Sequence, residues 1–74
     1  MARLPVLKPR QVVSLLVERG FVCIRQRGSH MQFRHADVRA TTVPDHGCRD
    51  ISPSLLRKIA RDIGVSPEEF VISK

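Results

Sequence analysis

The chain has 74 residues, of which 42% are hydrophobic, 13 are lysine or arginine and 7 are acidic, for a net charge of +6. This length suits one small domain, residues 1–74, with a modest core. No apolar run approaches the roughly 20 residues of a membrane span, so we expect a cytoplasmic location. Two cysteines, Cys23 and Cys48, make no disulfide framework, and we interpret both as small packing or surface residues.

The positive charge is concentrated in the first half of the chain. Residues 1–40 contain eight basic and two acidic side chains, whereas residues 41–74 contain five of each. A basic surface of this kind suits a polyanion, because lysine and arginine neutralise phosphates and release counterions. It would also suit an acidic protein partner, or it could simply be solvated. We favour nucleic acid as the partner.

The first predicted element after an irregular lead-in over residues 1–7 is a helix. It begins near Pro9, because proline is favoured in the first helical turn. Gly20 is a candidate left-handed residue at its end. The apolar residues between them recur at helical spacing: Val12, Val13, Leu16 and Val17.

Two strands are predicted next, over residues 21–24 and 30–35, on either side of Arg27-Gly28. A dipeptide that ends in glycine is typical of a two-residue hairpin turn. Side chains alternate between the two faces of a sheet, so pairing the strands across this turn sorts them into two sets. One face receives Val22, Ile24, Met31 and Phe33, and the other receives Arg25, His30 and Gln32.

The remaining chain predicts a third strand and two helical segments. The strand covers residues 40–43 and is stopped by Pro44. Ser52-Pro53 is an N-cap followed by a first-turn proline, which starts a second helix. Ser66 and Glu69 have capping-box spacing, so Ser66-Pro67 starts a short helical turn. This turn carries Phe70, which we expect in the core.

The order of these elements predicts an α+β fold. It is α-β-β-β-α, with a three-stranded antiparallel sheet in which Val43 lies opposite Phe33. Each helix has one apolar stripe and the sheet has one apolar face. We therefore expect both helices to cover that face and to leave the face that carries His30 open.

Metal or nucleotide chemistry has little support. Cys23, His46 and Cys48 could join a second histidine around Zn²⁺, but their spacing matches no familiar zinc pattern. The aspartates are too scattered to predict a Mg²⁺ site. Neither Gly20 nor Gly28 belongs to a nucleotide-binding glycine motif. We expect no metal and no organic cofactor.

An acid–base site that needs no metal is the chemistry that remains. RNA carries its own nucleophile, the 2′-hydroxyl, so cleavage requires only proton transfer and stabilisation of charge at phosphorus. A histidine can transfer the proton, and arginines can hold the phosphate. His30, beside Arg25 and Arg27 and with Ser29 and Gln32 nearby, meets this minimum. An exposed histidine beside a turn is often only a surface residue, so both interpretations stay open on the residues alone.

The other two histidines have weaker claims. His35 falls on the core side by parity or at a strand end, so we interpret it as structural. His46 lies in a polar loop, where it could be a second proton donor or have no role. Two other classes of function also remain: a non-catalytic RNA-binding module, and a protein that only regulates another protein.

Several segments of the chain, in this order and spacing, resemble the HicA toxins, which are small mRNA interferases of bacterial type II toxin–antitoxin pairs. The resemblance covers residues 8–70. The chain departs from the family at Ser52–Ser54, where the family often has a glycine before the leucines, and in its few lysines, whose place is taken by arginines. The segments that carry the resemblance are Gly20-Phe21, Arg25–His30, Val43–His46, Leu55–Ile59 and Phe70.

This resemblance implies a fold and a function. The fold is that of a double-stranded-RNA-binding domain, the substrate is mRNA and the partner is a HicB-type antitoxin. The family's catalytic histidine lies in its G-S-H element, which corresponds to His30. Arg25 and Arg27 would position phosphate, Gly28 would permit the turn and Ser29 would orient it, with Gln32 as a further RNA contact.

Overall fold

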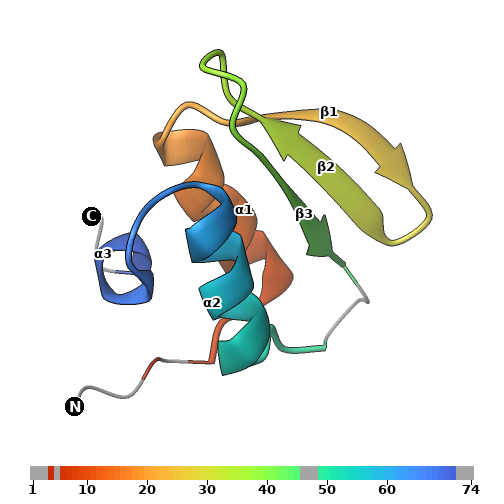
Figure 1. Ribbon diagram of the computed structural model, residues 1–74. Helices are drawn as coiled ribbons and strands as arrows, with labels where there is room; N and C mark the ends of the chain where they lie inside the picture. The colour runs from red at the N-terminus through yellow and green to blue at the C-terminus, as the bar shows by residue number, and fades with distance from the viewer. Residues whose placement is uncertain (1–3, 5, 46–48, 72–74) are drawn as a thin grey trace.

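The structure, a computed structural model, describes residues 4, 6–45 and 49–71. Three strands follow the first helix and two helices follow the strands, which confirms the predicted α+β fold and its order (Figure 1). The elements are α1 Pro9–Glu18, β1 Val22–Arg27, β2 His30–Arg34, β3 Ala40–Pro44, α2 Pro53–Asp62 and α3 Pro67–Val71.

The helices begin where the sequence predicts. α1 starts at Pro9. At the start of α2, the Ser52 Oγ accepts a hydrogen bond of 3.2 Å from the Leu55 N–H. At the start of α3, the Ser66 Oγ accepts one of 3.1 Å from the Glu69 N–H. Each serine thereby satisfies a backbone donor that the first helical turn leaves without a partner.

The sheet is antiparallel with strand order β1-β2-β3, and α1 and α2 lie on the same side of it (Figure 1). This confirms the prediction that both helices cover one face. Phe33 of β2 and Val43 of β3 are buried beneath the helices. The Thr41 Oγ1 donates a hydrogen bond of 3.0 Å to the Asp62 carboxylate of α2. β1 is exposed along its whole length, so the helices cover β2 and β3 and leave β1 uncovered.

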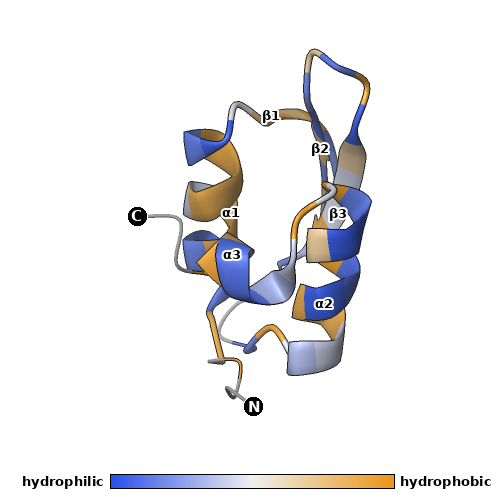
Figure 2. Cartoon of the chain, turned by 60° about the vertical axis from the view of Figure 1, so that its left-hand side comes forward, coloured by the Kyte–Doolittle hydropathy of each residue, from blue (hydrophilic) through white to orange (hydrophobic). Residues whose placement is uncertain are grey.

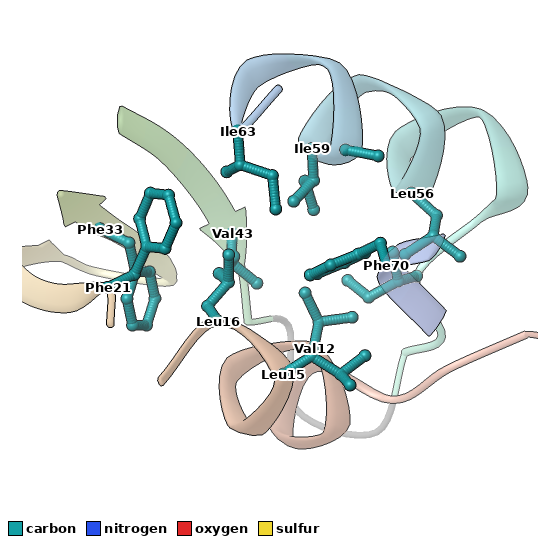
Figure 3. Packing of buried hydrophobic residues seen from close by; sticks show 12 residues of the cluster. Val12, Leu15, Leu16, Phe21, Phe33, Val43, Leu56, Ile59, Ile63 and Phe70 are labelled. Atoms are coloured by element: carbon teal, nitrogen blue, oxygen red, sulfur yellow. The ribbon is translucent and has the colours of Figure 1, made fainter. Parts of the chain in front are cut away.

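The core lies between α1, α2 and β3. Phe70 of α3 is fully buried, and its ring lies between Val12 of α1 and Ile59 of α2 (Figure 3). Phe21 and Phe33 form the neighbouring part of the same cluster. The hydrophobic side of α2 is turned inward and its outer side is hydrophilic (Figure 2). The prediction that Phe70 belongs to the core is confirmed.

The hairpin turn differs from the prediction by one residue. Gly28 and Ser29 form the turn, and Arg27 already pairs with His30. Gly28 has a φ of 54°, and Val38 is the only non-glycine residue with positive φ in the part of the chain that the structure describes. Positive φ at the first central residue alone is the pattern of a type II′ turn, where glycine is preferred. The predicted turn at Arg27-Gly28 is therefore wrong.

The apolar face predicted for β1 is also wrong. A bulge interrupts the β1–β2 pairing between Cys23 and Arg25. It places Cys23 opposite Phe33, and Val22 and Ile24 are 62% and 57% exposed. An extra residue in one strand reverses the faces of the residues beyond it. No residue type at this position indicates the bulge in the sequence.

The third strand is displaced by two residues from its predicted register. Val43 pairs with Met31 rather than with Phe33. The cause is the tight connection between β2 and β3, in which the His35 N–H donates a hydrogen bond to the Arg39 carbonyl and encloses a loop of three residues, 36–38. Val38 takes the left-handed position of this loop, with a φ of 71°, where glycine is the usual residue. A displacement by two residues keeps each side chain on its predicted face.

Candidate functional site

The face of the sheet turned away from the helices, the open face, contains a pocket at the hairpin end. The pocket has a volume of about 220 Å³. We call it the hairpin pocket. Its lining residues are Arg25, Arg27, His30, Gln32 and Thr42. The structure thus brings the predicted histidine together with both predicted arginines and the predicted glutamine.

Strand pairing explains why these side chains meet. His30 pairs with Arg27 on β1, and Gln32 pairs with Arg25 on β1 and with Thr42 on β3. Directly paired residues point to the same face, and residues two apart on one strand do so as well. Gln32 therefore occupies the middle of the pocket, between the arginines and Thr42.

Gly28 and Ser29, the two turn residues that we predicted to act at the site, support the pocket without lining it. The Ser29 carbonyl accepts a hydrogen bond from the Asp45 N–H, which ties the turn to the end of β3. The Gln26 side chain donates a hydrogen bond of 3.3 Å to the Gly28 carbonyl. These contacts hold the turn against the neighbouring strand, and thereby fix the position of His30, the next residue in the chain.

The open face is strongly positive. The three strands contain no aspartate or glutamate but include Arg25, Arg27 and Arg34, all exposed. None of these three arginines forms an ion pair with any residue that the structure describes. Three acidic residues elsewhere bind basic partners of their own: Asp37 with Arg39, Asp50 with Lys8 and Asp62 with Lys58. The charge of the face is therefore available to an anion.

His35 has a structural environment, as the sequence suggests. Its Nδ1 accepts a hydrogen bond of 3.1 Å from the Asp37 N–H, and its ring lies 5.1 Å from that of Phe21. The side-chain hydrogen bond from Arg39 lowers the pKa of Asp37. His46, the other candidate, lies outside the described residues.

Within the described ranges, no three histidine, cysteine, aspartate or glutamate side chains are grouped as a metal ion would require. The zinc candidates His46 and Cys48 lie outside these ranges, whereas Cys23 is an exposed free thiol. No helix in the described part of the chain has the length and apolar character needed to cross a membrane.

Thr42 is the lining residue that sequence reasoning missed. It lies opposite Gln32, and both face the hairpin pocket. The predicted register of β3 would have placed it farther along the sheet. The observed register of β3 follows from the three-residue loop over residues 36–38. A glycine at the left-handed position of that loop would have indicated it in the sequence, but the position holds Val38.

Comparison with protein families adds a finding of a different kind. The model of a family described as the HicA toxin of bacterial toxin–antitoxin matches residues 9–65. The chain belongs to this family. The match extends from α1 past the end of α2, so it includes every residue of the hairpin pocket. A search of curated proteins found no match.

Membership gives the chain a biological setting. As a HicA toxin, it is the toxin component of a toxin–antitoxin system, and its partner is an antitoxin. The predicted membership of this family is thereby confirmed.

Proposed function

We propose that this HicA toxin is an endoribonuclease that cleaves mRNA in the bacterial cytoplasm without a metal ion, with His30 as the catalytic residue. One observation carries the proposal. His30 lines the same pocket as Arg25 and Arg27, on a sheet face whose strands contain no acidic residue. Such a face attracts an RNA phosphate and does not repel the charge that cleavage adds to it.

The reaction is transfer of the phosphoryl group within the RNA. The 2′-oxygen forms a bond to the adjacent phosphorus, and the bond from phosphorus to the 5′-oxygen of the next nucleotide breaks. The 2′-hydroxyl loses a proton and the leaving oxygen gains one, and His30 carries one of these two transfers as general base or acid. The products are a 2′,3′-cyclic phosphate and a 5′-hydroxyl.

The other lining residues bind the substrate. The guanidinium groups of Arg25 and Arg27 hold the phosphate oxygens and stabilise the negative charge of the transition state. Gln32 and Thr42 offer hydrogen bonds to the nucleotide from the middle of the pocket. Gly28 and Ser29 act on RNA binding through the turn that they form.

The antitoxin is proposed to be of the HicB type and to inhibit cleavage. A basic pocket open to solvent can be blocked by an acidic protein surface, which would compete directly with RNA. His30→Ala should therefore abolish toxicity in cells and leave binding of the antitoxin intact. Loss of antitoxin binding together with toxicity would instead indicate a general loss of structure.

Analysis of the RNA ends tests the reaction. Purified toxin is incubated with a single-stranded RNA, the cut site is mapped, and the same RNA is made with a 2′-deoxy nucleotide at that site. We expect cyclic phosphate or 3′-phosphate ends and no cut at the deoxy position. Cleavage at the deoxy position would contradict a 2′-hydroxyl nucleophile. Tight binding without any cleavage would instead favour a non-catalytic RNA-binding module.

A further inference from the structure

The open face continues beyond the hairpin pocket, and this second part carries an inference that rests on the proposed function. We propose that Arg34, together with Val22, forms a subsite for a nucleotide that flanks the cleaved position. Arg34 would bind the phosphate of that nucleotide and Val22 would contact its base. Neither residue lines the hairpin pocket.

Arg34 shares the face of His30 because of its position on β2. His30, Gln32 and Arg34 are spaced two residues apart on one strand, so their side chains point to the same side. Arg34 lies four residues farther along the extended strand than His30, a distance of about 13 Å. An RNA strand that runs along β2 would therefore bring a flanking nucleotide, rather than the cleaved one, to Arg34.

The bulge in β1 places Val22 beside Arg34. Val22 pairs directly with Arg34, whereas Cys23 pairs with Phe33 on the face beneath the helices. Without the bulge, the alternation from Arg27 through Arg25 would place Cys23 on the open face. Bulges commonly redirect a side chain in this way. Val22 is 62% exposed, so the redirected side chain offers apolar surface to solvent or to a base.

The surroundings of Arg34 favour a phosphate. On the other side of β2, Arg34 pairs with Ala40, so its two neighbours across the sheet are small apolar residues without an acceptor for its guanidinium. Among the described residues, the guanidinium of Arg34 has no hydrogen-bond or ion-pair partner. A planar guanidinium in this position can bind a phosphate through two parallel hydrogen bonds.

The test measures affinity for RNA as a function of length, with strands that carry 2′-O-methyl groups throughout and cannot supply the nucleophile. Strands that increase by one nucleotide are titrated against the wild-type toxin, Arg34→Gln and Arg57→Gln. Arg57 is the matched control, since it is an exposed arginine on α2, on the other side of the sheet. Val22→Ser tests the apolar contact.

We expect the wild-type affinity to rise about tenfold when the strand becomes long enough to reach Arg34, as for one charge-assisted contact. Arg34→Gln should lose this increment and reduce the salt dependence of binding to long strands, and Arg57→Gln should retain both. Val22→Ser should lose a smaller part of the increment.

Two results would overturn the subsite. One is an increment that survives in Arg34→Gln, and the other is an equal loss in Arg34→Gln and Arg57→Gln, which would indicate general attraction to positive charge. Because binding is measured on strands that cannot be cleaved, the outcome is independent of catalysis by His30. Failure of the cleavage reaction and failure of this subsite are therefore distinguishable.

Discussion

Arg27 lies directly opposite His30, in the pair of residues that closes the β1–β2 hairpin. This pairing exists because the turn is formed by Gly28 and Ser29. A turn at Arg27-Gly28 would have placed Arg27 within the loop and Arg25 opposite the histidine. In the structure Arg25 is one pair farther along, opposite Gln32. Within the proposed mechanism, we therefore assign the larger share of transition-state stabilisation to Arg27.

This assignment predicts unequal effects of the two arginines on cleavage. Arg27→Gln should lower kcat/KM by about 100-fold, comparable to the loss of one preorganised donor to a transition state. Arg25→Gln should cost about tenfold. Arg27→Lys should recover part of the loss, because it restores the charge but not the two parallel hydrogen bonds. Equal losses for Arg25→Gln and Arg27→Gln in steady-state cleavage assays would contradict the assignment.

Two consecutive threonines of β3 allow stability and activity to be separated. Thr41 is buried and donates a hydrogen bond to Asp62, whereas Thr42 lines the hairpin pocket. Thr41→Val should lower the free energy of unfolding by about 1 kcal/mol and leave cleavage unchanged. Thr42→Val should do the reverse, with little change in stability and a weaker cleavage rate. Urea denaturation and cleavage assays on both variants check this. Loss of cleavage in Thr41→Val, or loss of stability in Thr42→Val, would contradict the faces assigned to the two side chains.

Two glycines should respond differently to alanine. Gly28 has a φ of 54° and open space around the position of a Cβ, so Gly28→Ala incurs only the left-handed backbone strain, about 1 kcal/mol. Gly20 has a φ of 91°, and a Cβ there would approach the His35 Nε2 to 3.1 Å. Gly20→Ala should therefore be the more destabilising change in thermal unfolding. A larger loss of stability in Gly28→Ala would show that the turn has a different conformation.

The link between Asp37 and Arg39 predicts a pH dependence of stability. The hydrogen bond from the Arg39 side chain lowers the pKa of Asp37 in the folded protein. A lowered pKa stabilises the fold above the unfolded value of about 4, and this contribution is lost as the pH falls through the folded value. Asp37→Asn should be less stable than the wild type at neutral pH, and the difference should shrink in acid. A difference that stays constant between neutral and acidic pH would rule out this contribution.

The elements that the sequence predicts well have local signals. The starts of α1, α2 and α3 follow from Pro9, Ser52-Pro53 and Ser66-Pro67, because proline and serine act within one helical turn. Alternation also places His30 and Gln32 on one face correctly, because they are two residues apart on one strand. The partner of Arg25 is displaced by two residues from the predicted one, from His30 to Gln32, and such a displacement preserves the face. The grouping of these residues with Arg25 was predictable for the same reason.

The features that the sequence does not predict depend on pairing between strands. The dipeptides Arg27-Gly28 and Gly28-Ser29 both contain the glycine that a tight turn requires, and only the pairing distinguishes them. The bulge at residues 23–25 has no signature of its own, so the exposure of Val22 was not foreseen. Thr42 was missed because Val38 occupies a left-handed loop position that usually holds glycine.

We propose that His30 catalyses RNA cleavage without a metal ion. The most direct measurement compares the cleavage rate of a single-stranded mRNA in EDTA by the wild type, by His30→Ala and by His35→Gln, with thermal unfolding of each protein as a control for folding. We expect cleavage by the wild type and by His35→Gln, and none by a folded His30→Ala. Cleavage by His30→Ala at the wild-type rate, or loss of wild-type cleavage in EDTA, would contradict this mechanism.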